Sequence, residues 1–182
     1  MEIMVVIAII GLVTAAVMLN FSGSNRDTEL DKETERLDAL FDYVREQAEL
    51  QTRDFGFRVN EKAYSFVVFD VLANEWRPAD EDDALRERDF PEGIEPRVVV
   101  EGRTIVLDVK KKPDKDVEDF SPQILIFSNG DISSFEVTLA REGARDPKKL
   151  ARIWSDEQSN VRVLLPGQVE EKNPPVRAAA AR

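Results

Sequence analysis

The sequence predicts an α+β fold in which a long N-terminal helix packs on antiparallel β-sheet. Two changes of pattern along the chain predict it. Before residue 52, apolar side chains recur at spacings of three and four residues, which is the period of an amphipathic helix. After residue 53, short runs alternate between apolar and polar side chains and are separated by turn residues, which is typical of consecutive hairpins. A helix followed by a run of strands predicts the α+β class.

Residues 1–23 are predicted to form a transmembrane helix. Ile3–Leu19 carries no charge, and as a helix it is roughly 26 Å long, near the short end of what crosses a bilayer. A cleaved signal peptide and a buried core helix are the alternatives. Signal peptides have basic residues before the apolar run and small residues at a cleavage site after it, and residues 1–23 show neither pattern.

Two charge features accompany this segment. Glu2 lies at the edge of the apolar run, where a carboxylate is costly in lipid unless it reaches the interface or meets a cation. Residues 22–38 are acidic on balance, whereas flanks retained in the cytoplasm are typically rich in Lys and Arg. The body of the protein is therefore predicted to lie outside the cytoplasm.

Composition excludes several classes of function. The net charge of −11 over 182 residues, with no basic patch, argues against nucleic acid as a partner. The chain has no Cys and no His, which removes thiol chemistry, the commonest general base and the commonest transition-metal ligand. An enzyme is not predicted, because carboxylates, Lys, Arg and Tyr alone would have to carry its chemistry.

Residues 24–52 are predicted to form an amphipathic helix of the soluble domain. Its apolar stripe consists of Leu30, Leu37, Leu40, Phe41, Val44 and Ala48. The opposite face, predicted to be solvated, comprises Asp31, Lys32, Glu35, Arg36, Asp38, Asp42, Arg45, Glu46 and Glu49. A coiled-coil seam is the alternative role for the stripe, but strand-like sequence follows at once and favours packing on a sheet.

Residues 53–169 are predicted to form an antiparallel β domain. Turn residues separate the strands, and Asn129-Gly130 is the strongest hairpin signal among them. The predicted pairs are 57–59 with 64–71, 98–100 with 104–109, 123–127 with 132–139, and 151–154 with 161–165, with 74–78 as an edge strand. Residues 79–89 are acidic and compatible with a helix. Residues 170–182 have little apolar content and are predicted to be a disordered tail.

Acidic clusters raise the possibility of a metal site. They are Asp80–Asp83, Asp114–Asp119, and Asp131 in its Gly-containing turn. Oxygen ligands suit Ca²⁺, but no stretch has the ligand spacing of an EF-hand loop. A solvated acidic surface is the preferred interpretation, so no metal and no cofactor are predicted. Lys110–Lys112 is interpreted as a loop tip rather than a lipid contact, because Asp114 follows closely.

Several segments resemble a known family. Glu2–Leu19 (EIMVVIAIIGLVTAAVML) resembles the N-terminal segment of type IV pilins and type II secretion pseudopilins. The body is similar to the protein H family of minor pseudopilins of the type II secretion system. The segments that carry this second resemblance are Gln51–Phe57, Tyr64–Asp70, Trp76, Phe127–Asp131 and Phe135–Leu139.

The resemblance implies a pilin-like fold and a structural role near the tip of a pseudopilus that assists export of folded proteins. It implies that Glu2 pairs with the N-terminal amine of a neighbouring subunit in the filament. The implied partners are the minor pseudopilins I, J and K, the major pseudopilin G, inner-membrane lipid, and a prepilin peptidase that cleaves a leader and methylates the new amine. The implied location is the bacterial inner membrane, crossed once, with the C-terminal domain in the periplasm.

The sequence departs from the family pattern at its start. Met1 stands where the family has the residue before the Glu, and the basic leader, the Gly and the Phe-Thr-Leu are missing. We expect a start codon upstream of Met1; processing and methylation depend on it. A minor pilin of a type IV pilus is the first alternative function. A membrane-anchored periplasmic enzyme or solute binder is the second.

Overall fold

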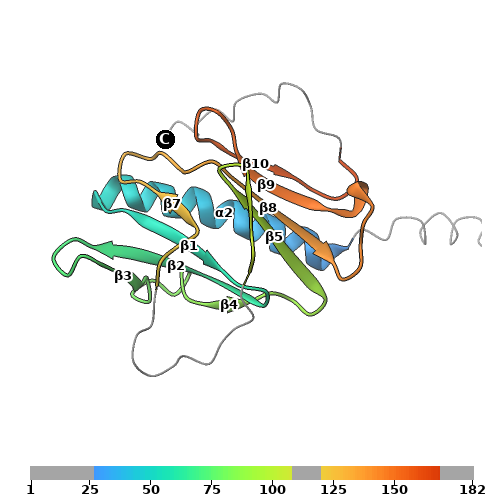
Figure 1. Ribbon diagram of the computed structural model, residues 1–182, viewed down its shortest axis with the longest axis horizontal. Helices are drawn as coiled ribbons and strands as arrows, with labels where there is room; N and C mark the ends of the chain where they lie inside the picture. Colours follow the sequence, from blue (N-terminus) through green and yellow to red (C-terminus); the bar gives the residue numbers. More distant parts are fainter. Residues whose placement is uncertain (1–26, 108–119, 169–182) are drawn as a thin grey trace, which may run out of the picture.

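The computed structural model describes residues 27–107 and 120–168 (Figure 1). The predicted membrane segment 1–23, the tail 170–182, Lys110–Lys112 and Asp114–Asp119 lie outside the described residues. Helix α2 (Thr28–Gln51) begins after the N-cap residue Asp27. It ends at Thr52, whose left-handed backbone lets its N–H reach the last carbonyls of the helix.

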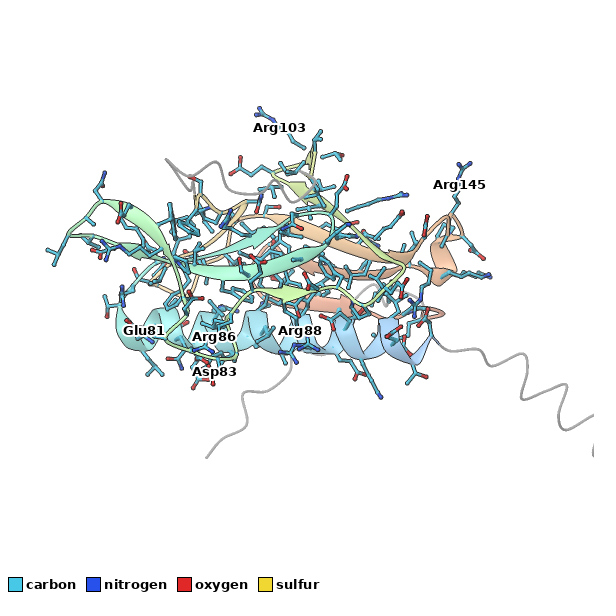
Figure 2. All side chains as sticks on the ribbon, turned by 90° about the horizontal axis from the view of Figure 1, so that it is seen from below. Glu81, Asp83, Arg86, Arg88, Arg103 and Arg145 are labelled. Atoms are coloured by element: carbon cyan, nitrogen blue, oxygen red, sulfur yellow. The ribbon has the colours of Figure 1, made fainter. Side chains whose placement is uncertain are left out.

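The strands form two antiparallel five-stranded sheets that share α2 along one side (Figure 2). The first sheet has the order β3-β2-β1-β7, with β4 also pairing with β2, and the second has the order β10-β9-β8-β5-β6. The strands are β1 (Phe55–Val59), β2 (Ala63–Asp70), β3 (Glu75–Pro78), β4 (Arg88–Asp89), β5 (Ile94–Val100), β6 (Arg103–Ile105), β7 (Ile124–Ile126), β8 (Phe135–Arg141), β9 (Ala151–Ser155) and β10 (Val161–Leu164), with a 3₁₀ turn, η1 (Pro147–Lys149), before β9.

Most of the predicted strand pairs are confirmed. The pairs β1–β2, β5–β6 and β9–β10 are antiparallel hairpins, and β3 pairs with β2 as the predicted edge strand. The strand predicted over 104–109 is shorter, because β6 ends at Ile105. Trp76 is half-buried on β3, with its ring 5.1 Å from that of Phe69.

The hairpin predicted around Asn129-Gly130 is wrong. The turn itself forms, with the Phe127 N–H donating to the Asp131 carbonyl at 2.8 Å and Gly130 at φ 84°. However, β7 and β8 belong to different sheets, and only an isolated bridge, Ile126 with Ile132, joins the two sides. β8 instead pairs with β5 over seven residues and with β9 over four. The longer ladders with distant strands therefore outweigh the local turn.

The helix considered for residues 79–89 does not form. These residues make turns and the short strand β4, and the Asp82 side chain accepts from the Ala84 N–H at 2.9 Å. Short acidic side chains compete in this way with helical hydrogen bonds. Leu85 and Phe90 are nevertheless buried, as their apolar character predicts. Asp38, predicted on the solvated face of α2, is also buried, so that prediction is wrong for this residue.

The core lies between α2 and both sheets. All six residues of the predicted apolar stripe are buried, which confirms that the stripe packs on β-structure. Phe41 is fully buried, and its ring lies 5.0 Å from Phe57 and 5.9 Å from Phe66, both in the first sheet. The same ring stacks at 4.8 Å on Phe135 of the second sheet. Phe41 therefore joins the helix to both sheets at once.

A close approach in the first sheet requires glycine at position 56. A Cβ placed there would lie 2.4 Å from both Cβ and Cγ of Pro122, and 3.2 Å from a methyl group of Val67. Real Cβ atoms do not approach so closely, and the proline ring cannot move aside as a flexible side-chain tip can. The missing side chain thus lets the segment that leads into β7 pack across β1.

We expect Gly56→Ala to lower the free energy of unfolding by about 1–3 kcal/mol, because the added methyl overlaps the Pro122 ring. Urea unfolding of residues 27–168 measures this loss. In a Pro122→Gly background, which lacks both contacting ring atoms, the cost of Gly56→Ala should be smaller. An equal cost in both backgrounds would contradict the explanation.

Candidate functional site

The site residue predicted from the sequence, Glu2, lies outside the described residues, and its pairing stays a prediction. The structure describes the place where the segment that contains Glu2 enters the domain. That place is Asp27, immediately before α2. We call Asp27 and the side chains that hold it the joint, because the chain enters the described domain there.

Asp27 is held by two kinds of contact at the joint. Its carboxylate accepts from the Leu30 N–H at 3.1 Å, which caps the helix. It also accepts two hydrogen bonds from the guanidinium of Arg141, from Nε at 2.5 Å and from Nη2 at 2.9 Å. Arg141 lies at the end of β8 and is 114 residues away in sequence. The first turn of α2 is therefore tied to the second sheet.

The same arginine makes two further contacts. Its Nη2 also donates to Glu29 in the first turn of α2 at 2.6 Å, and its Nη1 donates to the Glu92 carbonyl at 2.6 Å. Hydrogen bonds from Arg141 keep the pKa of the Asp27 carboxyl below its usual range, although partial burial opposes them. The pKa of Arg141 is raised, first by its bond to Asp27 and then by its bond to Glu29. Asp27 and Arg141 thus carry opposite charges near neutral pH.

A second polar contact fixes α2 against the first sheet. The Tyr64 hydroxyl of β2 donates to Glu33 at 2.6 Å, and both side chains are buried. Burial raises the pKa of Tyr64, and the hydrogen bond to Glu33 raises it further, so the phenol stays protonated as a donor. The guanidinium of Arg88 lies 4.0 Å from the same carboxylate. Glu33 is therefore a buried carboxyl group whose partners come from β2 and β4.

The C-terminal half of α2 meets the Phe127–Asp131 turn. Arg45 Nε donates to the Gly130 carbonyl at 2.6 Å, and a Cβ on Gly130 would lie 2.0 Å from Oε1 of Glu49. The carboxylate of Asp54, just after the helix, accepts from the Ser128 N–H at 2.8 Å. The turn that resembles protein H thus lies directly against the helix and is held at both sides by side chains.

Several carboxylates of the acidic clusters within the described residues are held by protein side chains. Asp82 accepts from the Tyr43 hydroxyl at 2.5 Å, and Asp83 pairs with Arg86 at 2.8 Å. Glu81, Asp83 and Arg86 lie beside α2 in Figure 2. Asp131 accepts from the Asn129 side chain at 2.7 Å. Across residues 27–107 and 120–168, no three His, Cys, Asp or Glu side chains gather as a metal site would require.

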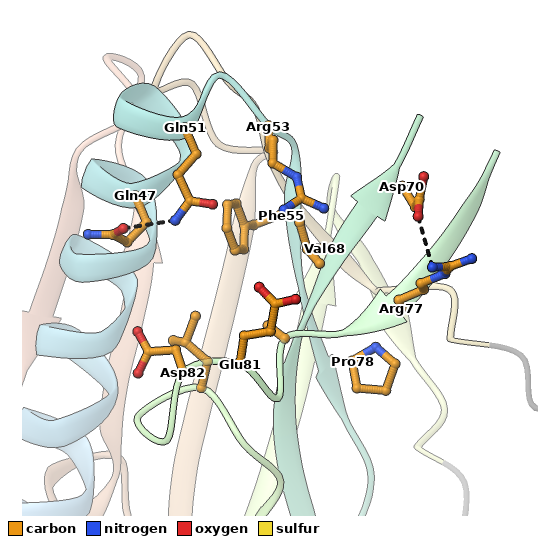
Figure 3. A pocket seen from close by; sticks show the side chains of 12 residues that line it. Gln47, Gln51, Arg53, Phe55, Val68, Asp70, Arg77, Pro78, Glu81 and Asp82 are labelled. Carbon is orange, nitrogen blue, oxygen red and sulfur yellow. Dashed lines mark hydrogen bonds and ion pairs between the residues drawn. The ribbon is translucent and has the colours of Figure 1, made fainter. Parts of the chain in front are cut away.

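The surface of the described residues has hollows, of which two are considered. The smaller, of about 160 Å³, lies between the C-terminal end of α2 and strands β2 and β3, and Figure 3 shows Gln47 and Gln51 on its helix side. Its charged groups have both signs, with Arg77 pairing with Asp70 at 2.9 Å. The larger, of about 860 Å³, lies beside the joint and is lined by residues from the turn before β5 and from β6. Since the chain has no His or Cys, neither hollow can present an imidazole or a thiolate.

Comparison with known proteins gives the family. No family model matches the chain. Type II secretion system protein H of Pseudomonas aeruginosa is 33% identical over 144 residues, which cover 78% of this chain and 81% of that protein. The chain belongs to the type II secretion system protein H family. The protein of the same name from Aeromonas hydrophila is 29% identical over 174 residues and covers 94% of both chains.

Solved structures agree on the fold. The minor pseudopilin EpsH from the type II secretion system of Vibrio cholerae has a TM-score of 0.64 at 19% identity, covering 78% of this chain and 99% of that one. The solution structure of E. coli GspH has a TM-score of 0.54, also at 19% identity, covering 76% and 89%. The chain is a minor pseudopilin of the type II secretion system with a pilin-like fold, and the type IV pilus alternative is not favoured.

The sequence analysis did not find the polar contacts that Asp27 and Glu33 make. Asp27, followed by Thr28 and Glu29, carries a recognisable signal for a helix start, since Asp is a preferred N-cap and acidic residues favour the first turn. No local pattern identifies Arg141 as its partner, because the contact spans 114 residues. Glu33 and Tyr64 likewise look like an ordinary helix-face carboxylate and an ordinary strand residue.

We expect Arg141→Gln to lower the free energy of unfolding by about 1–2 kcal/mol at pH 7, because it removes a charge-assisted hydrogen bond. The expected loss is kept small because both side chains are partly exposed. Since the pKa of Asp27 is lowered in the folded state, this contribution is present above the unfolded pKa, near 4, and is lost as the pH falls through the folded pKa. Urea unfolding from pH 7 to 2 measures it. The exposed Arg145→Gln should show no such pH dependence.

Tyr64→Phe should lower the free energy of unfolding by about 1–3 kcal/mol, because it leaves the buried Glu33 carboxylate without its hydroxyl donor. Tyr43→Phe is the matched control: it removes the bond to Asp82, at a more exposed position, and should cost less. Thermal or urea unfolding compares the two. Equal losses for both variants would contradict the role assigned to burial.

Proposed function

We propose that this protein is anchored by a single membrane-spanning helix, residues 1–23, in the inner membrane, with its domain in the periplasm. Its apolar N-terminal segment and its membership of the protein H family support this. Within the described ranges, 27–107 and 120–168, no helix is both long and apolar enough to span a bilayer. The apolar run that supports the anchor, Ile3–Leu19, comes before Asp27 in the sequence.

The proposed role is to join other pseudopilins in a filament near its tip and so to assist the export of folded proteins across the outer membrane. The observation that carries this proposal is the 33% identity to a protein H over most of both chains. The structure adds a domain fixed to one end of α2 through Asp27 and Arg141. Such a joint suits a subunit whose N-terminal helices pack together while its β domain faces outward.

The proposed partners are the minor pseudopilins I, J and K and the major pseudopilin G, together with lipid of the inner membrane. If the true N-terminus lies upstream of Met1, a prepilin peptidase is a further partner, which cleaves a leader and methylates the new N-terminal amine before assembly. Glu2 then pairs with the amine of a neighbouring subunit, since a carboxylate within packed apolar helices is favoured when it meets a cation. The role is structural rather than catalytic, and it requires no cofactor.

We expect Glu2→Ala to reduce recovery of the full chain with the other pseudopilins and to reduce secretion, while the domain stays folded. The reason is that the neighbouring amine loses its carboxylate partner. Secreted protein in the medium and pseudopilins co-purified from solubilised membranes are the measurements. Glu35→Ala, which removes an exposed carboxylate of α2, is the control and should have no effect. Normal co-purification and secretion by Glu2→Ala would contradict the role of Glu2.

A further inference from the structure

Strand β3 forms an outer edge of the first sheet. It pairs with β2 on one side, and among residues 27–107 and 120–168 no strand pairs with its other side (Figure 1). Such an edge presents backbone N–H and C=O groups that can pair with a strand of another molecule. Which groups it presents depends on the direction of each backbone N–H along the strand.

The hydrogen bonds of β3 direct the backbone of Trp76 and Pro78 away from β2. The Ala79 N–H donates to the Phe66 carbonyl at 3.1 Å. Hydrogen-bonded and non-hydrogen-bonded residue pairs alternate along an antiparallel ladder, so Arg77 also faces β2. The backbone of Trp76 and Pro78 then faces outward. Since proline has no N–H, Trp76 is the remaining outward donor within β3.

Strand β5 shows the same relation between proline and ladder in the second sheet. At one end of β5, the Glu142 N–H donates to the Gly93 carbonyl at 2.8 Å. At the other end, the Glu101 N–H donates to the Ser134 carbonyl at 2.9 Å. The odd-numbered residues of β5 therefore face β8, and the even-numbered residues face the side on which β6 lies.

The described part of this edge that extends beyond β6 lacks a free backbone donor. β6 pairs with β5 over Val98–Val100, so Ile94 and Pro96 have no partner strand on this side among the described residues. The Ile94 N–H already donates to the Pro91 carbonyl at 3.1 Å, and Pro96 has no N–H. One residue earlier or later, a proline would instead remove a hydrogen bond of the β5–β8 ladder.

Charged side chains do not protect the β3 edge by repulsion. Glu75 and Arg77 are both exposed, and they pair with each other at 2.9 Å. Because their charges have opposite sign, they do not repel a second copy of the strand as a row of like charges would. Of the devices that limit edge pairing, the shortness of β3 and its proline remain.

We propose that Pro78 and Pro96 close these two edges against strand addition by another molecule, including a second copy of this chain. In an antiparallel pair of β3 strands with position 76 opposite position 78 of the other copy, each hydrogen-bonded residue pair would exchange two bonds. Proline leaves one of the two. Neighbouring subunits then meet through side chains rather than through a shared sheet; this consequence rests on the proposed function, whereas the closure of the edges does not.

Cross-linking of the full chain tests the closure at β3. The chain has no Cys, so Glu75→Cys supplies a unique exposed thiol on β3 for a short bismaleimide. In this background, Pro78→Val should raise the yield of covalent dimer from the detergent-solubilised chain about tenfold, because each copy gains an N–H that faces the other. Pro147→Val is the matched control: it adds an N–H at an exposed 3₁₀ turn outside both sheets and should leave the yield unchanged.

An unchanged yield with Pro78→Val, or an equal rise with Pro147→Val, overturns the closure at β3. Residues 1–26 are common to all variants, so association through them contributes equally to each yield. Urea unfolding should show the same midpoint for Pro78→Val as for the parent, because the ladder bonds to β2 use Arg77 and Ala79 rather than position 78.

Pro96→Val tests the second edge with Glu95→Cys as the exposed thiol. Valine is apolar and close to proline in volume, so it suits this buried position. We expect a rise in covalent dimer over Glu95→Cys alone, and no rise overturns the role of Pro96. Dimer yield is measured without secretion, so both results are independent of the proposed function.

Discussion

The packing of Phe41 against both sheets is the contact on which the rest of the structure depends. Its ring touches Phe57 and Phe66 in one sheet and Phe135 in the other, and no part of it reaches solvent. Removing such a ring from a core typically costs about 3–5 kcal/mol. Because the two sheets have separate hydrogen-bond ladders, α2 and this aromatic cluster join them into one domain.

Polar contacts then fix the position of α2 on the two sheets. Hydrophobic packing is not directional, so by itself it allows a helix to slide or rotate. Arg141 of β8 bonds to the start of the helix, and Tyr64 of β2 bonds to its first half. Arg45, in the second half of the helix, bonds to the Phe127–Asp131 turn. These contacts set the orientation of the β domain relative to the start of α2.

Local patterns predicted the elements well because they depend on neighbours in sequence. The stripe of α2, the β1–β2 hairpin and the edge strand β3 all follow from periodicity and nearby turn residues. The same reasoning failed at Asn129-Gly130, where a good turn is followed by a strand that pairs elsewhere. It failed for Asp38 and did not find the role of Glu33, because charge alone indicates exposure unless a distant partner is known.

The sequence by itself determined the α+β class, the buried stripe of α2, the acidic character and the likeness to pseudopilins. Each of these is written in composition, in a period of a few residues, or in a contiguous motif such as Glu2–Leu19. The tertiary structure alone decided that the strands divide into two sheets, that Arg141 holds Asp27, and that the β2–β3 hairpin extends past the end of α2 opposite to Asp27. These features arise from contacts between residues far apart in the chain. The free energy of pairing two distant segments depends on both of them, so no local sequence pattern predicts it.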